Sequence, residues 1–368
     1  VILGFTGPIE SITPTMAAAA EMAMSEVSDS GKLLGGETVT SVRADSTCID
    51  SAAATAAAER LVTSDNVAAI VGADCSGVTG AIANNVAVPK GVVMISPSAT
   101  SPALTTIEDN GYFFRTAPSD ARQGQVLADM MKDQGITEIA VTYTNNDYGK
   151  GLADSFQAAF EAAGGKVSIS VPHEDGKGDY SAEVATLAAT GSKELAVFGY
   201  VDQGGRGIIQ SALDTGAFDK FVLCDGMIGD SLLEAFGDSL NGTIGTLPGN
   251  DGEGATKFLE LAKAKGIDGS GAFAPESYDA AALLMLAMEA AGSTDRAAIQ
   301  AKVLDVANGP GEPILPGELG KALEIIAKGG DVDYVGATGV ELIGPGEAAG
   351  SYKELLVDGG KFTTVQIR

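Results

Sequence analysis

The chain is 368 residues long, which is more than one ordinary hydrophobic core accommodates and favours two domains. Hydrophobic residues make up 45% and charged residues 20%, which is typical of a globular protein and argues against disorder. The formal net charge of −26 would repel nucleic acids, and no apolar run approaches the roughly 18–20 residues of a membrane-spanning helix.

The chain opens on an apolar run, Val1-Ile2-Leu3-Gly4, which is typical of the middle of a strand. We therefore expect that leading residues, and any export signal with them, have been removed.

Short β-branched runs alternate with longer Ala-rich runs along most of the chain. The predicted strands are residues 39–42, 67–71, 92–95, 139–143, 167–171, 195–198 and 221–223. The predicted helices are residues 51–63, 79–86, 123–134, 151–163, 181–189, 207–213, 255–265, 278–291 and 296–307. Repeated β-then-α units with apolar strands predict an α/β protein whose parallel sheets are covered on both faces.

Polar loops follow the predicted strands, and ligands of open α/β sheets bind outside the carboxyl ends of the strands. These loops offer hydroxyls, two tyrosines and carboxylates, but little that could act as a catalytic base. The candidate ligand-binding residues in them are Asp74, Ser76, Ser98, Ala99, Thr100, Tyr148, Tyr200 and Asp225.

The chemistry of these candidates suits an α-amino acid. Ser76 is expected near the start of a helix, where free N–H groups favour a carboxylate. Asp225 supplies a negative charge for an ammonium group. Taken singly, Ser76 and Thr100 could be helix caps, the tyrosines could be packing residues and Asp225 could be a turn acid. The hypothesis therefore depends on their joint position.

Catalytic and cofactor motifs are incomplete. Residues 72–79 approach a P-loop, but Val78 stands where the phosphate-binding lysine should be. His173 is the only histidine, and no G-x-S-x-G motif accompanies it. The three cysteines form no CxxC pair, which argues against a zinc site. We expect a binding protein without enzymatic activity, cofactor or metal.

Several segments together carry a family resemblance. They are residues 4–8 (GFTGP), 71–77 (VGADCSG), 95–100 (ISPSAT), 114–116 (FRT) with Asp120 and Gln123-Gly124, 147–153 (DYGKGLA) and 333–337 (DYVGA). The chain resembles the periplasmic leucine/isoleucine/valine-binding proteins of ABC importers, which have the type I periplasmic binding fold. The match runs in order through nearly the whole chain.

The resemblance implies two doubly wound parallel-sheet lobes joined by a three-strand hinge, with a ligand trapped between the lobes by hinge closure. The crossovers are expected near residues 115–118, 246–248 and 330–335. Residues 1–117 and 248–331 would then form the N-terminal lobe, and residues 118–247 and 332–368 the C-terminal lobe.

The resemblance also implies roles for the candidate residues. Ser76 and Thr100 would bind the ligand carboxylate, and Thr100 and the carbonyl of Ala99 would bind the ammonium group. Tyr148 and Tyr200 would come from the second lobe.

Asp225 stands where the family usually has a glutamate for the ammonium group, so the acid here is shorter by one methylene. The resemblance implies a disulfide between Cys48 and Cys75, which points to an oxidising compartment. Cys224 would then be unpaired.

The ligand side chain is left open by the sequence. Ile12 suits an aliphatic ligand, and Phe273 is a candidate aromatic wall. Glu10 and Asp74 would suit a polar or basic ligand side chain if they point into the pocket. If they point to solvent, neither contacts the ligand.

The expected function is that of a periplasmic, monomeric component of an ABC importer, which binds an amino acid, preferably aliphatic or branched, and meets permease subunits. Three alternatives remain: a polar or basic amino acid, an amide, urea-like or aromatic carboxylate ligand, or a sensor that feeds no transporter.

Overall fold

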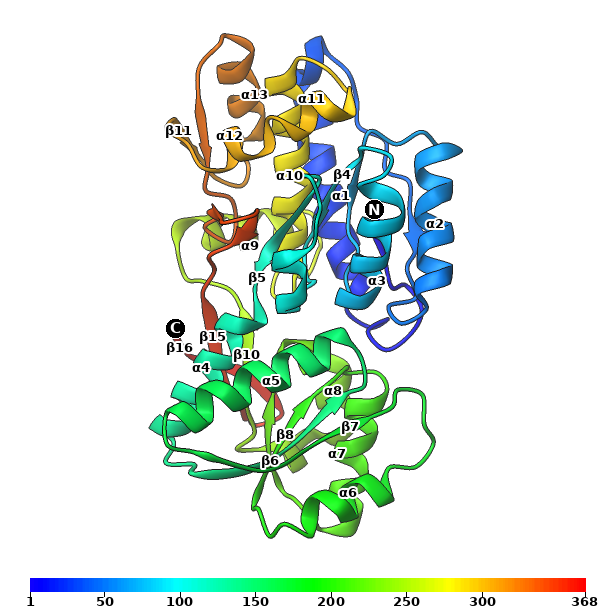
Figure 1. The fold of residues 1–368 in the computed structure, drawn as a ribbon. Coiled ribbons are helices and arrows are strands. Elements are labelled where there is room, and N and C mark those ends of the chain that lie inside the picture. Colours follow the sequence, from blue (N-terminus) through cyan, green and yellow to red (C-terminus); the bar gives the residue numbers. More distant parts are fainter.

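The chain forms two lobes, each built on its own β-sheet (Figure 1). The structure is a computed structural model that describes residues 1–368. No helix in it is both long enough and apolar enough to cross a bilayer.

The sheet of the first lobe has five strands in the order β13-β14-β5-β4-β3, and a parallel pair, β1-β2, lies beside it. A bridge between Ile2 and Gly72 connects the two sets of strands. The strands are β1 (Ile2–Leu3), β2 (Ala44–Asp45), β3 (Ala69–Val71), β4 (Val93–Ser96), β5 (Phe113–Pro118), β13 (Leu342–Ile343) and β14 (Glu347–Ala348). The helices are α1 (Thr13–Ser30), α2 (Ser51–Thr63), α3 (Ser76–Ile82), α9 (Glu253–Ala264), α10 (Ala274–Ala291), α11 (Arg296–Gln300), α12 (Val303–Ala307) and α13 (Leu319–Ala327).

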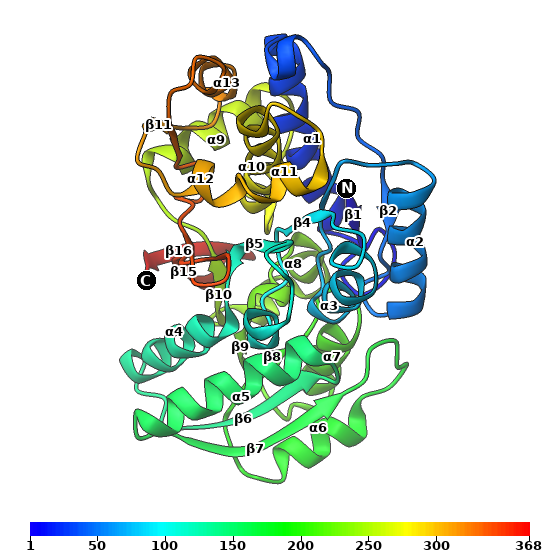
Figure 2. The same ribbon diagram turned by 45° about the horizontal axis from the view of Figure 1, so that its top comes forward.

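The sheet of the second lobe has seven strands in the order β16-β15-β10-β9-β8-β6-β7. Its core strands are parallel, and β15 and β16 are added antiparallel beside β10 (Figure 2). The strands are β6 (Glu138–Thr144), β7 (Lys166–His173), β8 (Glu194–Phe198), β9 (Lys220–Leu223), β10 (Ile244–Pro248), β15 (Tyr352–Asp358) and β16 (Lys361–Ile367). The helices are α4 (Asp120–Asp133), α5 (Asp147–Ala162), α6 (Ser181–Ala188), α7 (Gly204–Thr215) and α8 (Asp230–Phe236).

Local sequence explains where the helices begin. Asp50 accepts hydrogen bonds from the backbone N–H groups of Ala52 and Ala53 at the start of α2, so the predicted helix over residues 51–63 is confirmed. Asn146 caps α5 in the same way. The central helix α10 is buried around most of its circumference because alanine, leucine and methionine follow one another there.

Two predicted elements differ from the structure. Residues 39–42 are not a strand, because the segment that pairs in register with β1 is Ala44 and Asp45. The predicted helix over residues 296–307 is divided into α11 and α12, and the turn between them keeps Ile299 and Val303 both buried. Helices α1, α8 and α13 were not predicted from the sequence.

The third crossover lies later than residues 330–335. Strand β12 (Val332–Tyr334) pairs with β11 (Glu312–Ile314), and β14 pairs with β5 in the first lobe. The buried Asp279 carboxylate on α10 holds this segment by accepting hydrogen bonds from the Tyr334 hydroxyl (2.7 Å) and from the backbone N–H of Ala337 (2.8 Å). The chain joins the second sheet only at β15, so the predicted lobe boundary between residues 331 and 332 is wrong.

Candidate ligand-binding site

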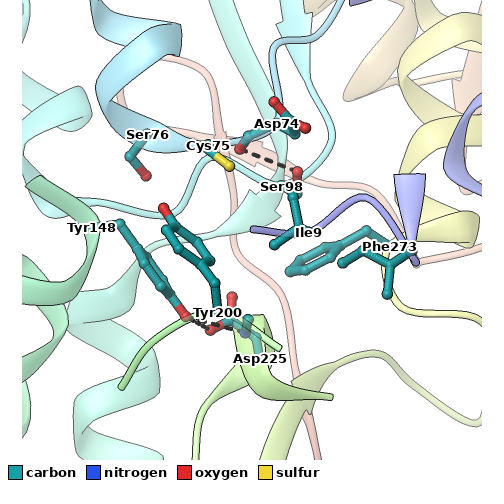
Figure 3. Close-up of a pocket in the computed structure, with 11 residues that line it drawn as sticks. Ile9, Asp74, Cys75, Ser76, Ser98, Tyr148, Tyr200, Asp225 and Phe273 are labelled. Carbon is teal, nitrogen blue, oxygen red and sulfur yellow. Dashed lines mark hydrogen bonds between the residues drawn. The ribbon is translucent and has the colours of Figure 1, made fainter. Parts of the chain in front are cut away.

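A small pocket lies where the two lobes meet (Figure 3). The space between its lining atoms, open solvent at the edge included, is about 310 Å³. The lining residues are Ile9, Ile12, Asp74, Cys75, Ser76, Ser98, Tyr148, Tyr200, Asp225, Gly226 and Phe273. The pocket suits a small, partly apolar molecule.

Two stacked tyrosines form the wall contributed by the second lobe. Tyr148 is in the first turn of α5, and Tyr200 follows β8. Their ring centroids are 5.3 Å apart, and the rings are inclined by 18°. The Tyr200 hydroxyl accepts a hydrogen bond from the Asn146 side chain (3.3 Å), which fixes its ring from the N-terminus of α5. Both rings therefore present fixed surfaces to a ligand.

Asp225 follows β9 and is the buried acid of this wall, with 1% of its surface exposed. The Tyr148 hydroxyl donates a hydrogen bond to the Asp225 carboxylate (2.6 Å) and accepts one from the backbone N–H of Gly226 (3.1 Å). Burial raises the pKa of Asp225 above its ordinary value. A cationic group in the pocket would relieve this cost, because it would pair with the carboxylate.

Asp120, in the first turn of α4, is a second buried acid near Asp225. The Thr100 hydroxyl lies beside the Asp120 carboxylate, but neither group makes a hydrogen bond of ordinary geometry. Burial raises the pKa of Asp120, and the negative charge of Asp225 raises it further. Asp120 was not predicted as a ligand contact, although it lies two residues after the end of β5 and belongs to a segment that carries the family resemblance.

The first lobe contributes Ser76 and Ser98. Ser76 is the first residue of α3, after Cys75 in the N-cap position, and its hydroxyl accepts a hydrogen bond from the backbone N–H of Ser101 (3.0 Å). The Ser98 hydroxyl donates to the backbone carbonyl of Asp74 (3.2 Å). Ser76 therefore does not serve as a helix cap, and the two hydroxyls tie together the loops that follow β3 and β4.

Ala99 and Thr100 are fully buried and do not line the pocket. The Arg115 guanidinium, on β5, donates to the carbonyls of Ala99 (3.1 Å) and Ser101 (2.9 Å), and it also pairs with Glu347 on β14. Arg115 was missed as a residue that shapes the site. Its burial inside the sheet gives no pattern that sequence periodicity detects.

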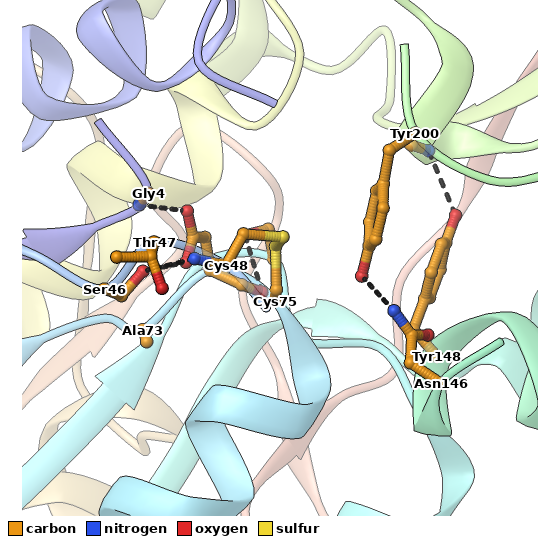
Figure 4. The surroundings of a disulfide bond; sticks show 12 residues. Gly4, Ser46, Thr47, Cys48, Ala73, Cys75, Asn146, Tyr148 and Tyr200 are labelled. Atoms are coloured by element: carbon orange, nitrogen blue, oxygen red, sulfur yellow. Dashed lines mark hydrogen bonds between the residues drawn. A yellow bond between two sulfur atoms is a disulfide. The ribbon is translucent and has the colours of Figure 1, made fainter. Parts of the chain in front are cut away.

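The structure separates the two acids that the sequence left open. Glu10 is exposed, and its carboxylate accepts a hydrogen bond from the backbone N–H of Gly7 (3.2 Å), away from the pocket. Asp74 is buried and lines the pocket, but its carboxylate accepts hydrogen bonds from the backbone N–H of Gly4 and from the Ser46 hydroxyl (2.8 Å) (Figure 4). Asp74 thus joins three segments of the first lobe.

Cys48 and Cys75 form a disulfide beside Asp74, as the resemblance implied (Figure 4). Cys75 itself lines the pocket, so the bond fixes part of the pocket wall. Cys224 is a buried free thiol. His173 is buried at the end of β7, where its ring contacts the Thr142 hydroxyl (2.9 Å), and it does not reach the pocket.

Eight of the predicted ligand-binding residues line the pocket, and three do not: Glu10, Ala99 and Thr100. Ile9, Cys75 and Gly226 also line it and were not predicted as ligand contacts. Ile9 lies one turn before Ile12, and the backbone N–H of Ile12 donates to its carbonyl (3.1 Å). The three-residue spacing from Ile12 could have predicted that Ile9 also faces the pocket.

Hydrogen bonds across the pocket mouth hold the lobes together. The Ser101 hydroxyl of the first lobe donates to the backbone carbonyl of Asp147 (3.1 Å) in the second. The backbone N–H of Ser11 donates to the Asp202 carboxylate (2.8 Å), and the backbone N–H of Asp202 donates to the Pro8 carbonyl (3.0 Å). The structure therefore shows the lobes closed on each other.

Two closing lobes around a small pocket define a class of solute-binding proteins. The model of the family described as periplasmic binding protein matches residues 1–309, so the chain belongs to this family, in its type I, leucine/isoleucine/valine-binding branch. The family consists of binding proteins and not of enzymes, in agreement with the sequence-based expectation.

Among curated proteins, the chain is similar to the leucine-, isoleucine-, valine-, threonine- and alanine-binding protein of Pseudomonas aeruginosa, with 31% identity over 298 residues that cover 79% of this chain and 77% of the relative. Two solved structures share the fold. The leucine-binding protein LivK of Thermotoga maritima has a TM-score of 0.83 and 24% identity, and covers 100% of this chain and 97% of its own. LivJ of Streptococcus pneumoniae in complex with isoleucine has a TM-score of 0.82 and 21% identity, with the same coverage.

Proposed function

We propose that the protein binds a free amino acid with an aliphatic side chain between its lobes and delivers it to an ABC importer. The observation that carries this proposal is the buried Asp225–Tyr148 pair, which faces hydroxyls of the first lobe across an otherwise apolar pocket. The relatives named above are described as binding leucine, isoleucine or valine.

The proposed polar contacts divide between the lobes. Ser76 would receive the ligand carboxylate, and Asp225 would receive the ammonium group. The unpartnered Thr100 hydroxyl and the buried Asp120 carboxylate lie near enough to Asp225 to support the ammonium end. The Ala99 carbonyl already accepts from Arg115 and would offer its second lone pair.

The apolar contacts support an aliphatic side chain over a basic one. Ile9, Ile12 and Phe273 line the pocket opposite the tyrosines. Asp74, the acid that would attract a basic side chain, is already engaged by Gly4 and Ser46. A ligand cation would compete with both of these bonds.

We further propose that the protein acts in the periplasm as a monomer that meets permease subunits. The disulfide supports an oxidising compartment, where such bonds persist.

Thermal unfolding of ligand-stripped protein tests this function against the common amino acids, with amides, urea and aromatic acids added. A ligand at 100 times its Kd stabilises the folded state by about 2.7 kcal/mol. We expect dose-dependent rises in Tm with leucine, isoleucine or valine. Rises with arginine or lysine alone would favour a basic ligand, and rises with aromatic acids alone would contradict an amino-acid site.

A further inference from the structure

A second cavity lies inside the hinge, apart from the ligand pocket. Its empty volume is about 240 Å³. All three crossovers line it together with α10 and the segment that Asp279 holds: Thr116, Pro118, Pro248, Gly249, Glu276, Thr338, Gly339, Ala348, Gly350 and Ser351. Since the crossovers change direction relative to one another when the lobes rotate, the shape of this cavity depends on the angle between the lobes.

Glu276 places a carboxyl group in this cavity. The residue is in the first turn of α10, and only 2% of its surface is exposed. Its backbone carbonyl accepts a hydrogen bond from the Thr116 hydroxyl on β5 (2.8 Å), which ties the helix to the first crossover. No side chain donates a hydrogen bond to its carboxyl group.

The hydroxyl groups around Glu276 all donate hydrogen bonds to acceptors other than its carboxyl group. Thr116 donates to the Glu276 carbonyl, Thr338 donates to Asp279 (2.7 Å) and Ser351 donates to the Gly249 carbonyl (2.9 Å). They can offer only lone pairs to the Glu276 carboxyl group. Such surroundings favour the protonated acid, which donates a hydrogen bond, over the carboxylate, which needs donors.

The charged groups around Glu276 provide little compensation. Lys353 on β15 packs against Gly249 outside the cavity, and its positive charge acts on Glu276 only weakly against burial. Asp279, one turn further along α10, acts in the opposite sense. Arg115 on β5 is engaged by its own salt bridge, and Glu26 on α1 accepts a hydrogen bond from Tyr278.

The same turn of α10 also reaches the ligand pocket. Phe273, the residue before this helix, lines the pocket, and its carbonyl accepts hydrogen bonds from the backbone N–H (3.0 Å) and the hydroxyl (2.7 Å) of Ser277. The hinge cavity and the pocket wall are therefore connected by a single helical turn.

We propose that Glu276 couples proton binding to lobe closure: the hinge closes with Glu276 protonated and is driven open when Glu276 ionises. An ionised carboxylate in the closed cavity would have only its own backbone N–H as a donor, whereas an opened hinge admits water to hydrate it.

Burial raises the pKa of Glu276 to about 8 in the closed structure. In an open hinge with more water around the carboxyl group, the pKa would lie closer to its ordinary value. The closed state therefore binds the proton more tightly. Its advantage is complete at low pH and is lost as the pH rises through about 8.

X-ray scattering of the ligand-free protein at pH 6 and pH 9 tests the coupling without relying on the identity of the ligand. We expect the radius of gyration of the wild type to increase at pH 9, and that of Glu276→Gln, which keeps the shape of the neutral acid, to remain at its value at pH 6. The matched control Glu10→Gln removes an exposed carboxyl group and should behave as the wild type.

A second readout uses leucine affinity, which rests on the proposed function. Leucine should bind the wild type at least threefold more weakly at pH 9 than at pH 6, and bind Glu276→Gln equally at both. The coupling is wrong if the wild type and Glu276→Gln show the same pH dependence of the radius of gyration. Failure of leucine to bind at any pH would instead reject the ligand and leave the scattering result to decide the coupling.

Discussion

At the scale of single residues, two buried acids in one pocket have different surroundings. Asp74 accepts hydrogen bonds from Gly4 and Ser46 and thereby connects separate segments of the first lobe. Asp225 has one strong donor, the Tyr148 hydroxyl, and faces the space between the lobes. Composition and loop position made the two acids equal candidates, and only their partners distinguish them.

Asp225→Asn tests the proposed ammonium contact. The amide keeps the size of the side chain but removes its charge, so a buried ammonium group would lose its counter-ion. We expect the Kd for leucine, measured by calorimetry, to rise more than tenfold. Asp219→Asn, which alters an exposed acid in the same lobe, should leave the Kd unchanged. An unaltered Kd for Asp225→Asn would remove this residue from the ligand site.

At the scale of elements, short contacts between loops set how closely the lobes approach. Gly151 on α5 lies against the loop of the first lobe that begins η3 (Pro102–Thr106), and a Cβ there would stand 2.9 Å from Pro102. Asp202, in the loop after β8, reaches the segment before α1 with both its carboxylate and its backbone N–H. These loops therefore act as a clasp at the mouth of the pocket.

Asp202→Ala removes one bond of this clasp. The ligand pocket is untouched, so association should change little while the closed state is held less well. We expect leucine to dissociate several-fold faster in stopped-flow measurements, with a Tm within about 2 °C of the wild type in the absence of ligand. Asp214→Ala, on the exposed face of α7, is the matched control. Unchanged dissociation in Asp202→Ala would mean that the clasp does not retain the ligand.

Sequence patterns predicted elements best where local signals agree. In helix α2 the N-cap, the alanine-rich sequence and the spacing of the buried residues all indicate the same helix. Its bounds were predicted correctly. The division between α11 and α12 was missed because the apolar spacing continues across a turn. The strand expected at residues 39–42 has the right composition, but pairing with β1 selects Ala44 and Asp45 instead.

At the scale of the whole molecule, the two-lobe architecture was predictable from the β–α alternation and the resemblance, whereas the path of the chain late in the fold was not. The third crossover depends on Asp279 and on the pairing of β14 with β5, contacts between residues far apart in sequence. Asp120 and Arg115 were missed for a related reason. Asp120 matters for its buried carboxylate oxygens, and Arg115 matters for its hydrogen bond to the buried Ala99 carbonyl. No local sequence pattern predicts either feature.

The central claim is that the closing lobes recognise an α-amino acid through its ammonium group. Calorimetric titration of ligand-stripped protein with leucine and with 2-hydroxy-4-methylpentanoate, which replaces the ammonium by a hydroxyl, tests it most directly. We predict one leucine per chain and an affinity for the hydroxy acid that is at least 100-fold weaker, because Asp225 would remain buried without a counter-ion. Equal affinities, or binding of the hydroxy acid alone, would contradict this recognition.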